Sequence, residues 1–193
     1  MTEAERMQVR EEELFQEELD RIHRRGDRMF VRLMFFQYLF AIGLAVIVAP
    51  YTCAGVEKSL HPNTNAVLGL GFVFMIFPGL LGSFRSGETA TRHVVASSQM
   101  QYSALFIHLT QGRIETHFYV FGSLAILALY RDSRVLITAT LVVYVDHLAR
   151  GYWYPQSVYG VLEATPWRSF EHAGWVLFEV AFLIRASGKA STR

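Results

Sequence analysis

The sequence has few of the residues that usually report a protein's compartment or its nucleic-acid binding. It contains one cysteine, Cys53, which excludes an internal disulfide and a cysteine-rich metal site. Charged residues make up only 18% of the chain and its formal net charge is +1, so it lacks the basic surface of a nucleic-acid-binding protein. The charge is also unevenly placed, because nine of the 17 acidic residues lie in the first 27 positions.

Apolar residues are abundant, at 52% of the chain. They form six stretches of about 17–22 residues, close to the length of helix that crosses a bilayer. These stretches are 29–50, 65–84, 90–110, 114–130, 134–150 and 168–185. The sequence therefore predicts an all-α fold. We expect a charged cytoplasmic helix over 1–27, a six-span transmembrane helical bundle over 28–186 and a cytoplasmic tail over 187–193. The third stretch carries several amides and hydroxyls, so we expect it inside the bundle.

Basic residues are distributed asymmetrically over this topology. On the side of the amino terminus lie 14 of the 18 lysines and arginines. The four on the other side are Lys58, Arg113, Arg150 and Arg168. Because cytoplasmic loops are enriched in lysine and arginine, this bias predicts that both termini are cytoplasmic.

Four histidines occur near the outer ends of the last four predicted spans. They are His108, His117, His147 and His172. Ionisable groups in membrane segments are costly and usually functional, and imidazole is the commonest metal ligand in proteins. Four imidazoles at one depth on different helices are the arrangement that a metal site within a bundle needs. The alternative interpretation is that each histidine is merely a polar residue at headgroup level.

Carboxylates accompany these histidines, and their helical angles separate their roles. Glu179 follows His172 by seven residues and so lies on the same helix face, roughly 10 Å deeper. We expect it to be a fifth ligand. Glu115, Asp146 and Glu171 point away from the neighbouring histidines, so we expect them to hold the ligands in place from behind. Of the remaining histidines, His93 falls at the opposite end of its span and His23 is expected to be solvated.

Three segments resemble a known family. IHLTQGRIETHFYVFGSLAILALYRD (107–132), VDHLARGYWYPQSVYGVL (145–162) and PWRSFEHAGWVLFE (166–179) are similar to the membrane-embedded amino-terminal input domain of bacterial hybrid sensor histidine kinases and chemoreceptor-like proteins. The resemblance implies a sensory domain of the bacterial inner membrane that works as a homodimer, and all eight candidate site residues stand on matching positions. Family members often carry histidine where this chain has Tyr119. The family's cytoplasmic output region would follow Arg193, where this sequence ends.

The candidate ligands leave the metal and the function class open. Mixed imidazole and carboxylate ligands suit Fe, Zn or Cu, as one ion or two, and haem b is the rival cofactor. A sensor that signals through the bundle is the function that the resemblance favours. A membrane di-metal oxidase or hydroxylase, and a purely structural or proton-handling bundle, are the alternatives.

Overall fold

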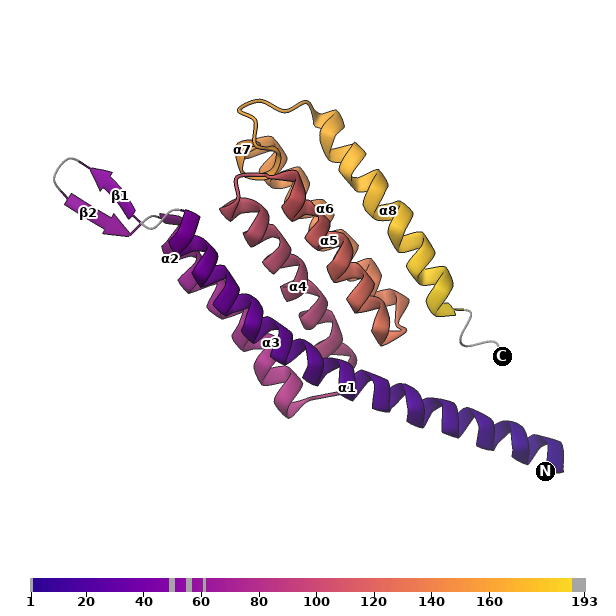
Figure 1. Cartoon of the computed structure of the whole chain (residues 1–193). Helices are drawn as coiled ribbons and strands as arrows, with labels where there is room; N and C mark the ends of the chain where they lie inside the picture. Colours follow the sequence, from indigo (N-terminus) through magenta and orange to yellow (C-terminus); the bar gives the residue numbers. More distant parts are fainter. Residues whose placement is uncertain (1, 49–50, 55–56, 61, 189–193) are drawn as a thin grey trace.

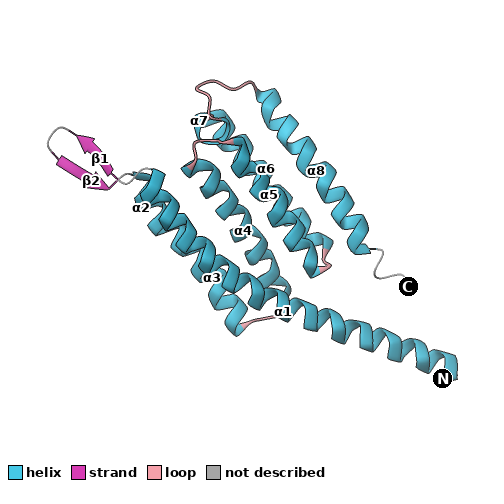
Figure 2. Cartoon of the chain, in the orientation of Figure 1, coloured by secondary structure: helices cyan, strands magenta, loops and turns pink. Residues whose placement is uncertain are grey.

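Helices account for nearly all of the described chain in this computed structural model, and the described strands form one short hairpin (Figures 1 and 2). The structure describes residues 2–48, 51–54, 57–60 and 62–188. The elements in chain order are α1 (Glu3–Val48), β1 (Tyr51–Ala54), β2 (Glu57–Leu60), α2 (Pro62–Ala66), the π-helical turn η1 (Val67–Gly71), α3 (Phe72–Phe84), α4 (Thr89–Leu109), α5 (Ile114–Leu127), the 3-10 turn η2 (Ala128–Tyr130), α6 (Ser133–Trp153), α7 (Gln156–Tyr159) and α8 (Pro166–Gly188). The segment 187–193 is described only to residue 188.

α1 is one unbroken helix that crosses the predicted boundary between residues 27 and 28. Its buried residues recur every three or four positions, which places them on one face of the helix. They are His23, Asp27, Phe30, Met34, Gln37, Ala41 and Ala45. This face packs against α3 and α4, whereas the part of α1 before His23 projects beyond the bundle (Figure 1).

α4 lies at the centre of the bundle. It packs against α1, α3, α5 and α6, and 13 of its 21 residues are buried. Two of its buried polar side chains bond to other elements: the Gln99 amide donates to Ser123 Oγ (3.0 Å) and the Tyr102 hydroxyl donates to the carbonyl of Gly71 (2.7 Å). This is the interior position expected for the polar third stretch, because a bilayer offers no partners for such groups.

The prediction of six transmembrane spans is wrong. Among the described residues only two helical segments, Glu3–Val48 and Thr64–Phe84, are long and apolar enough to cross a membrane. α5 ends after 14 residues and even with η2 reaches only residue 130, which is too short. α4, α6 and α8 are long enough, but their arginines, histidines, amides and carboxylates lower their hydropathy. Apolar stretches in the sequence therefore marked helices of a bundle, not six separate membrane crossings.

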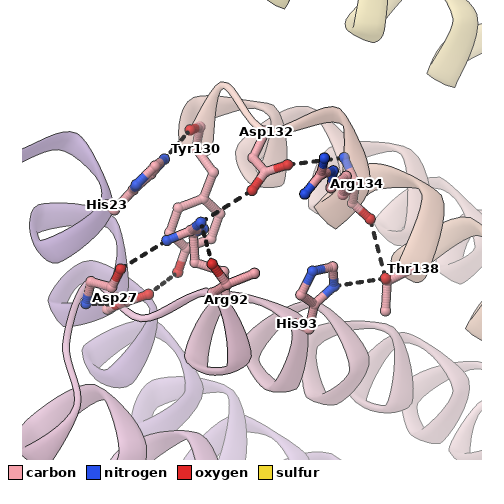
Figure 3. A network of polar contacts seen from close by, with 10 residues as sticks. His23, Asp27, Arg92, His93, Tyr130, Asp132, Arg134 and Thr138 are labelled. Atoms are coloured by element: carbon pink, nitrogen blue, oxygen red, sulfur yellow. Dashed lines mark hydrogen bonds and ion pairs between the residues drawn. The ribbon is translucent and has the colours of Figure 1, made fainter. Parts of the chain in front are cut away.

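A buried carboxylate joins three parts of the chain at the end of the bundle away from the predicted histidine layer (Figure 3). Asp27 of α1 is fully buried. It accepts a hydrogen bond from the Tyr130 hydroxyl (2.7 Å) and another from the backbone N–H of Gly87 (2.7 Å). Nearby, Arg92 of α4 forms an ion pair with Asp132 (3.2 Å). We call His23, Asp27, Arg92, Tyr130 and Asp132 the basal network.

His23 is part of this network, so the expectation that it is solvated is wrong. Its ring is buried, and its Nε2 lies 3.1 Å from the carbonyl oxygen of Tyr130. Burial lowers the pKa of His23, and the nearby Arg92 lowers it further. His93 lies at the same end of α4 as Arg92, with its Nδ1 2.8 Å from Thr138 Oγ1 (Figure 3). It is therefore far along α4 from the predicted site, as expected.

Two glycines of α3 provide a matched test of how closely α1 and α3 approach. A Cβ on Gly82 would lie 2.5 Å from Val31 Cγ2, whereas nothing lies within 4 Å of a Cβ on Gly79. We predict that Gly82→Ala lowers the free energy of unfolding by about 1–3 kcal/mol, because a stiff β-branched side chain must move. Gly79→Ala should stabilise by about 0.5–1 kcal/mol through helix propensity. Thermal melting followed by circular dichroism measures both, and equal effects would contradict this packing.

Acidification should destabilise the basal network through His23. Its folded-state pKa lies below the ordinary value of about 6.5, so the unfolded chain binds the proton more readily. The His23 contribution to stability is therefore complete above about pH 6.5 and declines as the pH falls toward the lowered folded value. We predict that His23→Gln, which keeps a donor and cannot titrate, reduces this pH dependence. Between about pH 7.5 and about pH 5, the melting temperature of the variant should fall less than that of the unchanged chain. An unchanged pH dependence would exclude this role.

Candidate metal centre

Three of the four predicted histidines come together in the structure. His117 is in the first turn of α5, His147 is in the last two turns of α6 and His172 is in the second turn of α8. The ring centroids are 5.7 Å apart for His117 and His147, 5.3 Å for His117 and His172, and 5.9 Å for His147 and His172. We call these three side chains the imidazole cluster.

The three rings are held in the same way. Each Nδ1 lies within hydrogen-bond distance of the carbonyl oxygen four residues earlier in its own helix: Arg113 (3.0 Å), Val143 (3.1 Å) and Arg168 (2.9 Å). A carbonyl oxygen only accepts, so each Nδ1 is the donor and each neutral ring keeps its lone pair on Nε2. His117 Nε2 is buried and has no hydrogen-bond partner among the described residues.

Histidines that bind a metal through Nε2 usually donate a hydrogen bond from Nδ1–H to a carbonyl oxygen or a carboxylate. The three rings make this Nδ1 hydrogen bond. With metal–nitrogen distances of about 2.1 Å and tetrahedral angles, imidazole centroids around one ion lie roughly 5 Å apart. The observed separations are slightly larger. In the part of the chain that the structure describes, no group of three or more His, Cys, Asp or Glu side chains is arranged so that it could hold a metal ion.

Asp146 stands behind His147. Its Oδ2 lies 3.4 Å from His147 Nδ1, and its carboxylate forms an ion pair with Arg150, whose Nε donates to Oδ1 (2.7 Å). This is the supporting position that the sequence predicts for Asp146. The carboxylate orients the imidazole and is itself neutralised by the guanidinium, so no unpaired charge is left beside the cluster.

His108 occupies a separate position. Its Nδ1 lies 2.8 Å from Ser157 Oγ, which also accepts from Arg150 Nη1 (2.8 Å). His108 is thus connected to His147 through Ser157, Arg150 and Asp146, and its ring is not among the three that the structure brings within 6 Å of one another.

The three other predicted carboxylates form no hydrogen bond with the three rings among the described residues. Glu115 is exposed and pairs with Arg113 (3.4 Å); its pKa is lowered by its own helix N-terminal backbone N–H and by Arg113. Glu171 is exposed and accepts from Trp167 Nε1 (2.8 Å). Glu179 Oε2 is buried and has no hydrogen-bond partner among the described residues. It lies about two helical turns beyond His172, as its spacing predicts.

Several neighbours of the cluster could not be predicted from helical spacing. Tyr159 of α7 lies beside His172, with ring centroids 5.2 Å apart, and its hydroxyl is 2.8 Å from Ser169 Oγ. α7 is held in place by Gly112, where φ is +74° and a Cβ would lie 2.3 Å from the backbone N of Gly160. Only glycine permits this contact. The position of α7 depends on the close contact between Gly112 and Gly160, and helical spacing in the sequence cannot predict such a contact.

Tyr119 stands where the resembled family often has histidine. Its hydroxyl forms hydrogen bonds with the amides of Gln37 and Gln99 inside the bundle. Its ring packs edge-on against Phe106, with centroids 5.0 Å apart. Tyr119 therefore belongs to the packing of α5 against α1 and α4.

An apolar groove opens beside the imidazole cluster. It lies between α5, α6 and α8 and has a volume of about 1060 Å³. The three histidines line it together with apolar side chains that include Phe118, Phe121, Leu141, Tyr144 and Trp175. A site with several imidazoles facing an apolar space can bind a metal ion and present it to a ligand that enters from the groove.

In comparisons with known proteins, no protein-family model, no curated protein and no solved structure matches the chain. The function of the chain is therefore inferred from the site itself.

Proposed function

We propose that this chain is a membrane-embedded sensory domain that binds one non-haem transition-metal ion through His117, His147 and His172. The observation that supports the proposal is the shared geometry of these rings: their centroids lie within 5.9 Å of one another, and each Nδ1 is bound to its own helix, which leaves the lone pair of each neutral ring on Nε2. Imidazole ligands suit Zn, Cu and Fe. In this proposal His108 and Asp146 act through the Ser157–Arg150 connection.

The ring separations favour a single non-haem ion over haem b. A haem plane would have to pass between two axial imidazoles. Here the third ring lies within 5.9 Å of both of the others, in the space that the porphyrin would need. Three histidine ligands are also too few for a di-metal oxidase, which would need further ligands close to the cluster.

Exposed apolar side chains support a location in the bilayer. Phe36 of α1 is 65% exposed, Phe84 of α3 is 82% exposed and Phe118 of α5 is 67% exposed. Large apolar patches of this kind mark surfaces that are covered by lipid or protein. We propose that α1 and the segment Thr64–Phe84 cross the cytoplasmic membrane of a bacterium, with the basal network at the cytoplasmic side. The chain would form a homodimer there and pass its signal to a cytoplasmic kinase or chemoreceptor region.

Metal binding offers a direct mechanism for signalling. α8 packs along α6 and makes far fewer contacts with α5. An ion held by His117 and His172 would tie α8 to α5, so the position of α8 would depend on occupancy.

The metal site is tested by single histidine substitutions. We predict that His117→Ala, His147→Ala or His172→Ala abolishes stoichiometric metal binding, because two imidazoles remain. Asp146→Asn should weaken affinity by about 10–100-fold, since it only orients His147. Elemental analysis of the purified protein and its absorption spectrum are the measurements. His93→Ala, at the opposite end of α4, is the control. Full occupancy in the three variants, or a haem absorption band, would overturn the proposal.

The movement of α8 is tested by spin-label distances. In a Cys53→Ser background, labels at Ile126→Cys on α5 and Phe182→Cys on α8 should approach each other when metal is added. A pair at Leu39→Cys on α1 and Ile137→Cys on α6 should keep its distance, because α1 carries none of the three histidines and α6 already packs along α8 without the ion. All four positions are exposed. An unchanged α5–α8 distance in metal-loaded protein would exclude this mechanism.

A further inference from the structure

Arginines gather on one face of α1, just before its apolar half. At about 100° per residue they fall within an arc of roughly 100°. This arc lies nearly opposite the buried face with which α1 packs against α3 and α4. All of these side chains are exposed, and they are Arg24, Arg25, Arg28 and Arg32.

Another exposed arginine, Arg85, comes to the same level from the end of α3. α1 and α3 lie side by side (Figure 1). Ser86 Oγ donates to the carbonyl oxygen of Arg24 (3.2 Å), and the backbone N–H of Gly87 donates to Asp27 (2.7 Å). These contacts place the turn after α3 beside the arginines of α1. We call the set the arginine layer: Arg24, Arg25, Arg28, Arg32 and Arg85.

Few acidic side chains offset this positive charge. Among the described residues, no arginine of the layer on α1 has an ion-pair partner. Arg85 pairs with Glu88 at 3.8 Å, and both side chains are largely exposed, so this pair is weak. Asp27 is buried and already bound within the basal network. The acidic residues within 17–20 lie about a turn or more further toward the amino terminus. The arginine layer therefore presents a positive surface.

Beyond the arginine layer, the same face of α1 becomes apolar. Its exposed side chains there fall within or close to the arc of the arginines, and they are Phe35 (48% exposed), Phe36 (65%) and Leu39 (49%). On α3, Phe84 is 82% exposed and directly precedes Arg85. The ranges 33–48 and 64–84 contain no charged residue. They belong to the two helical segments that are long and apolar enough to cross a membrane.

This order of arginines and then exposed aromatic side chains fits a phospholipid with an anionic headgroup. A guanidinium can bind a phosphate through two parallel hydrogen bonds. Basic residues directly beside a membrane-crossing helix attract anionic lipids, and each strengthens the association by roughly fivefold. A nucleic acid or an acidic peptide would contact the arginines alone, whereas the acyl chains of a phospholipid would also cover the aromatic side chains next to them.

We propose that the arginine layer binds the phosphates of anionic phospholipids, whose acyl chains lie along the exposed apolar side chains of α1 and α3. This inference rests on the proposal that α1 and the segment Thr64–Phe84 cross the membrane. It is independent of the metal ion.

Spin-labelled lipids measure this selectivity in a bilayer. The full chain is reconstituted in phosphatidylcholine, and the fraction of a trace spin-labelled lipid that the protein immobilises is recorded. The labelled lipids are phosphatidylglycerol and phosphatidylcholine with the same acyl chains. Phosphatidylglycerol should associate at least about threefold more strongly, because the roughly fivefold effect of each arginine is averaged over all lipid contacts of the protein. Raising the salt concentration to about 1 M should remove most of this preference, because the arginines are exposed.

A triple variant removes most of the arginine layer without disturbing the fold. Arg24 is retained because it packs closely on the turn after α3, where a Cβ on Gly87 would lie 2.9 Å from its Cγ. The combined changes Arg25→Gln, Arg28→Gln and Arg32→Gln should make the association of phosphatidylglycerol nearly equal to that of phosphatidylcholine. Lysine at the same three positions should restore most of the preference, because the charge is kept.

A matched control removes the same charge from the same helix outside the arginine layer. It combines Arg6→Gln, Arg10→Gln and Arg21→Gln. Arg10 and Arg21 already pair with glutamates of the acidic segment. This variant should keep the preference for phosphatidylglycerol.

The outcomes separate this inference from the proposed membrane crossing. Equal immobilisation of both lipids by the unchanged chain would overturn the headgroup site and leave the membrane crossing standing. Immobilisation of neither lipid would overturn both. Displacement of phosphatidylglycerol by glycerol phosphate, but not by sodium chloride of equal ionic strength, would mean that the layer binds a free phosphate. An unchanged preference in the layer variant, together with loss of a crosslinked dimer, would assign the layer to the acidic segment of a second copy.

Discussion

Polar side chains inside an apolar bundle must find their partners within the chain, and that constraint fixes how these helices are joined. Asp27 satisfies its two carboxylate oxygens with a hydroxyl from η2 and a backbone N–H from the α3–α4 turn. The Gln99 amide of α4 donates a hydrogen bond to the Ser123 hydroxyl of α5. An unsatisfied buried group costs about 1–3 kcal/mol, so these bonds select one arrangement of helices that apolar contacts alone would leave undefined.

The two ends of the bundle use polar groups differently. In the basal network His23, Tyr130 and Arg92 each bond to a group in another element, although the buried Arg92 Nε has no partner among the described residues. In the imidazole cluster each ring is bound only to its own helix, and His117 Nε2 has no partner among the described residues. Contacts between α5 and α8 are also sparse. The helices are therefore joined less extensively at the cluster than at the basal network.

Helical periodicity predicted the all-α class and the common depth of the histidines, because position along a helix follows directly from residue number. It failed where the outcome depends on tertiary contacts. His23 looked like part of a solvated charged helix, yet it packs against Tyr130 because α1 continues without a break. His108 and the three clustered rings lie near the same ends of their helices, but Ser157, delivered by α7, takes up the His108 nitrogen. The count of six spans failed because helix length and helix polarity are separate properties, and α4, α6 and α8 satisfy only the first.

The continuity of α1 has a mechanical consequence. A helix of 46 residues is a rod about 69 Å long. Its second half is clamped in the bundle and its first 20 or so residues project freely (Figure 1). A small tilt of the half that packs in the bundle therefore displaces the amino-terminal end by a larger distance, with the basal network near the pivot point. The acidic segment at that end would therefore move further than any helix inside the bundle.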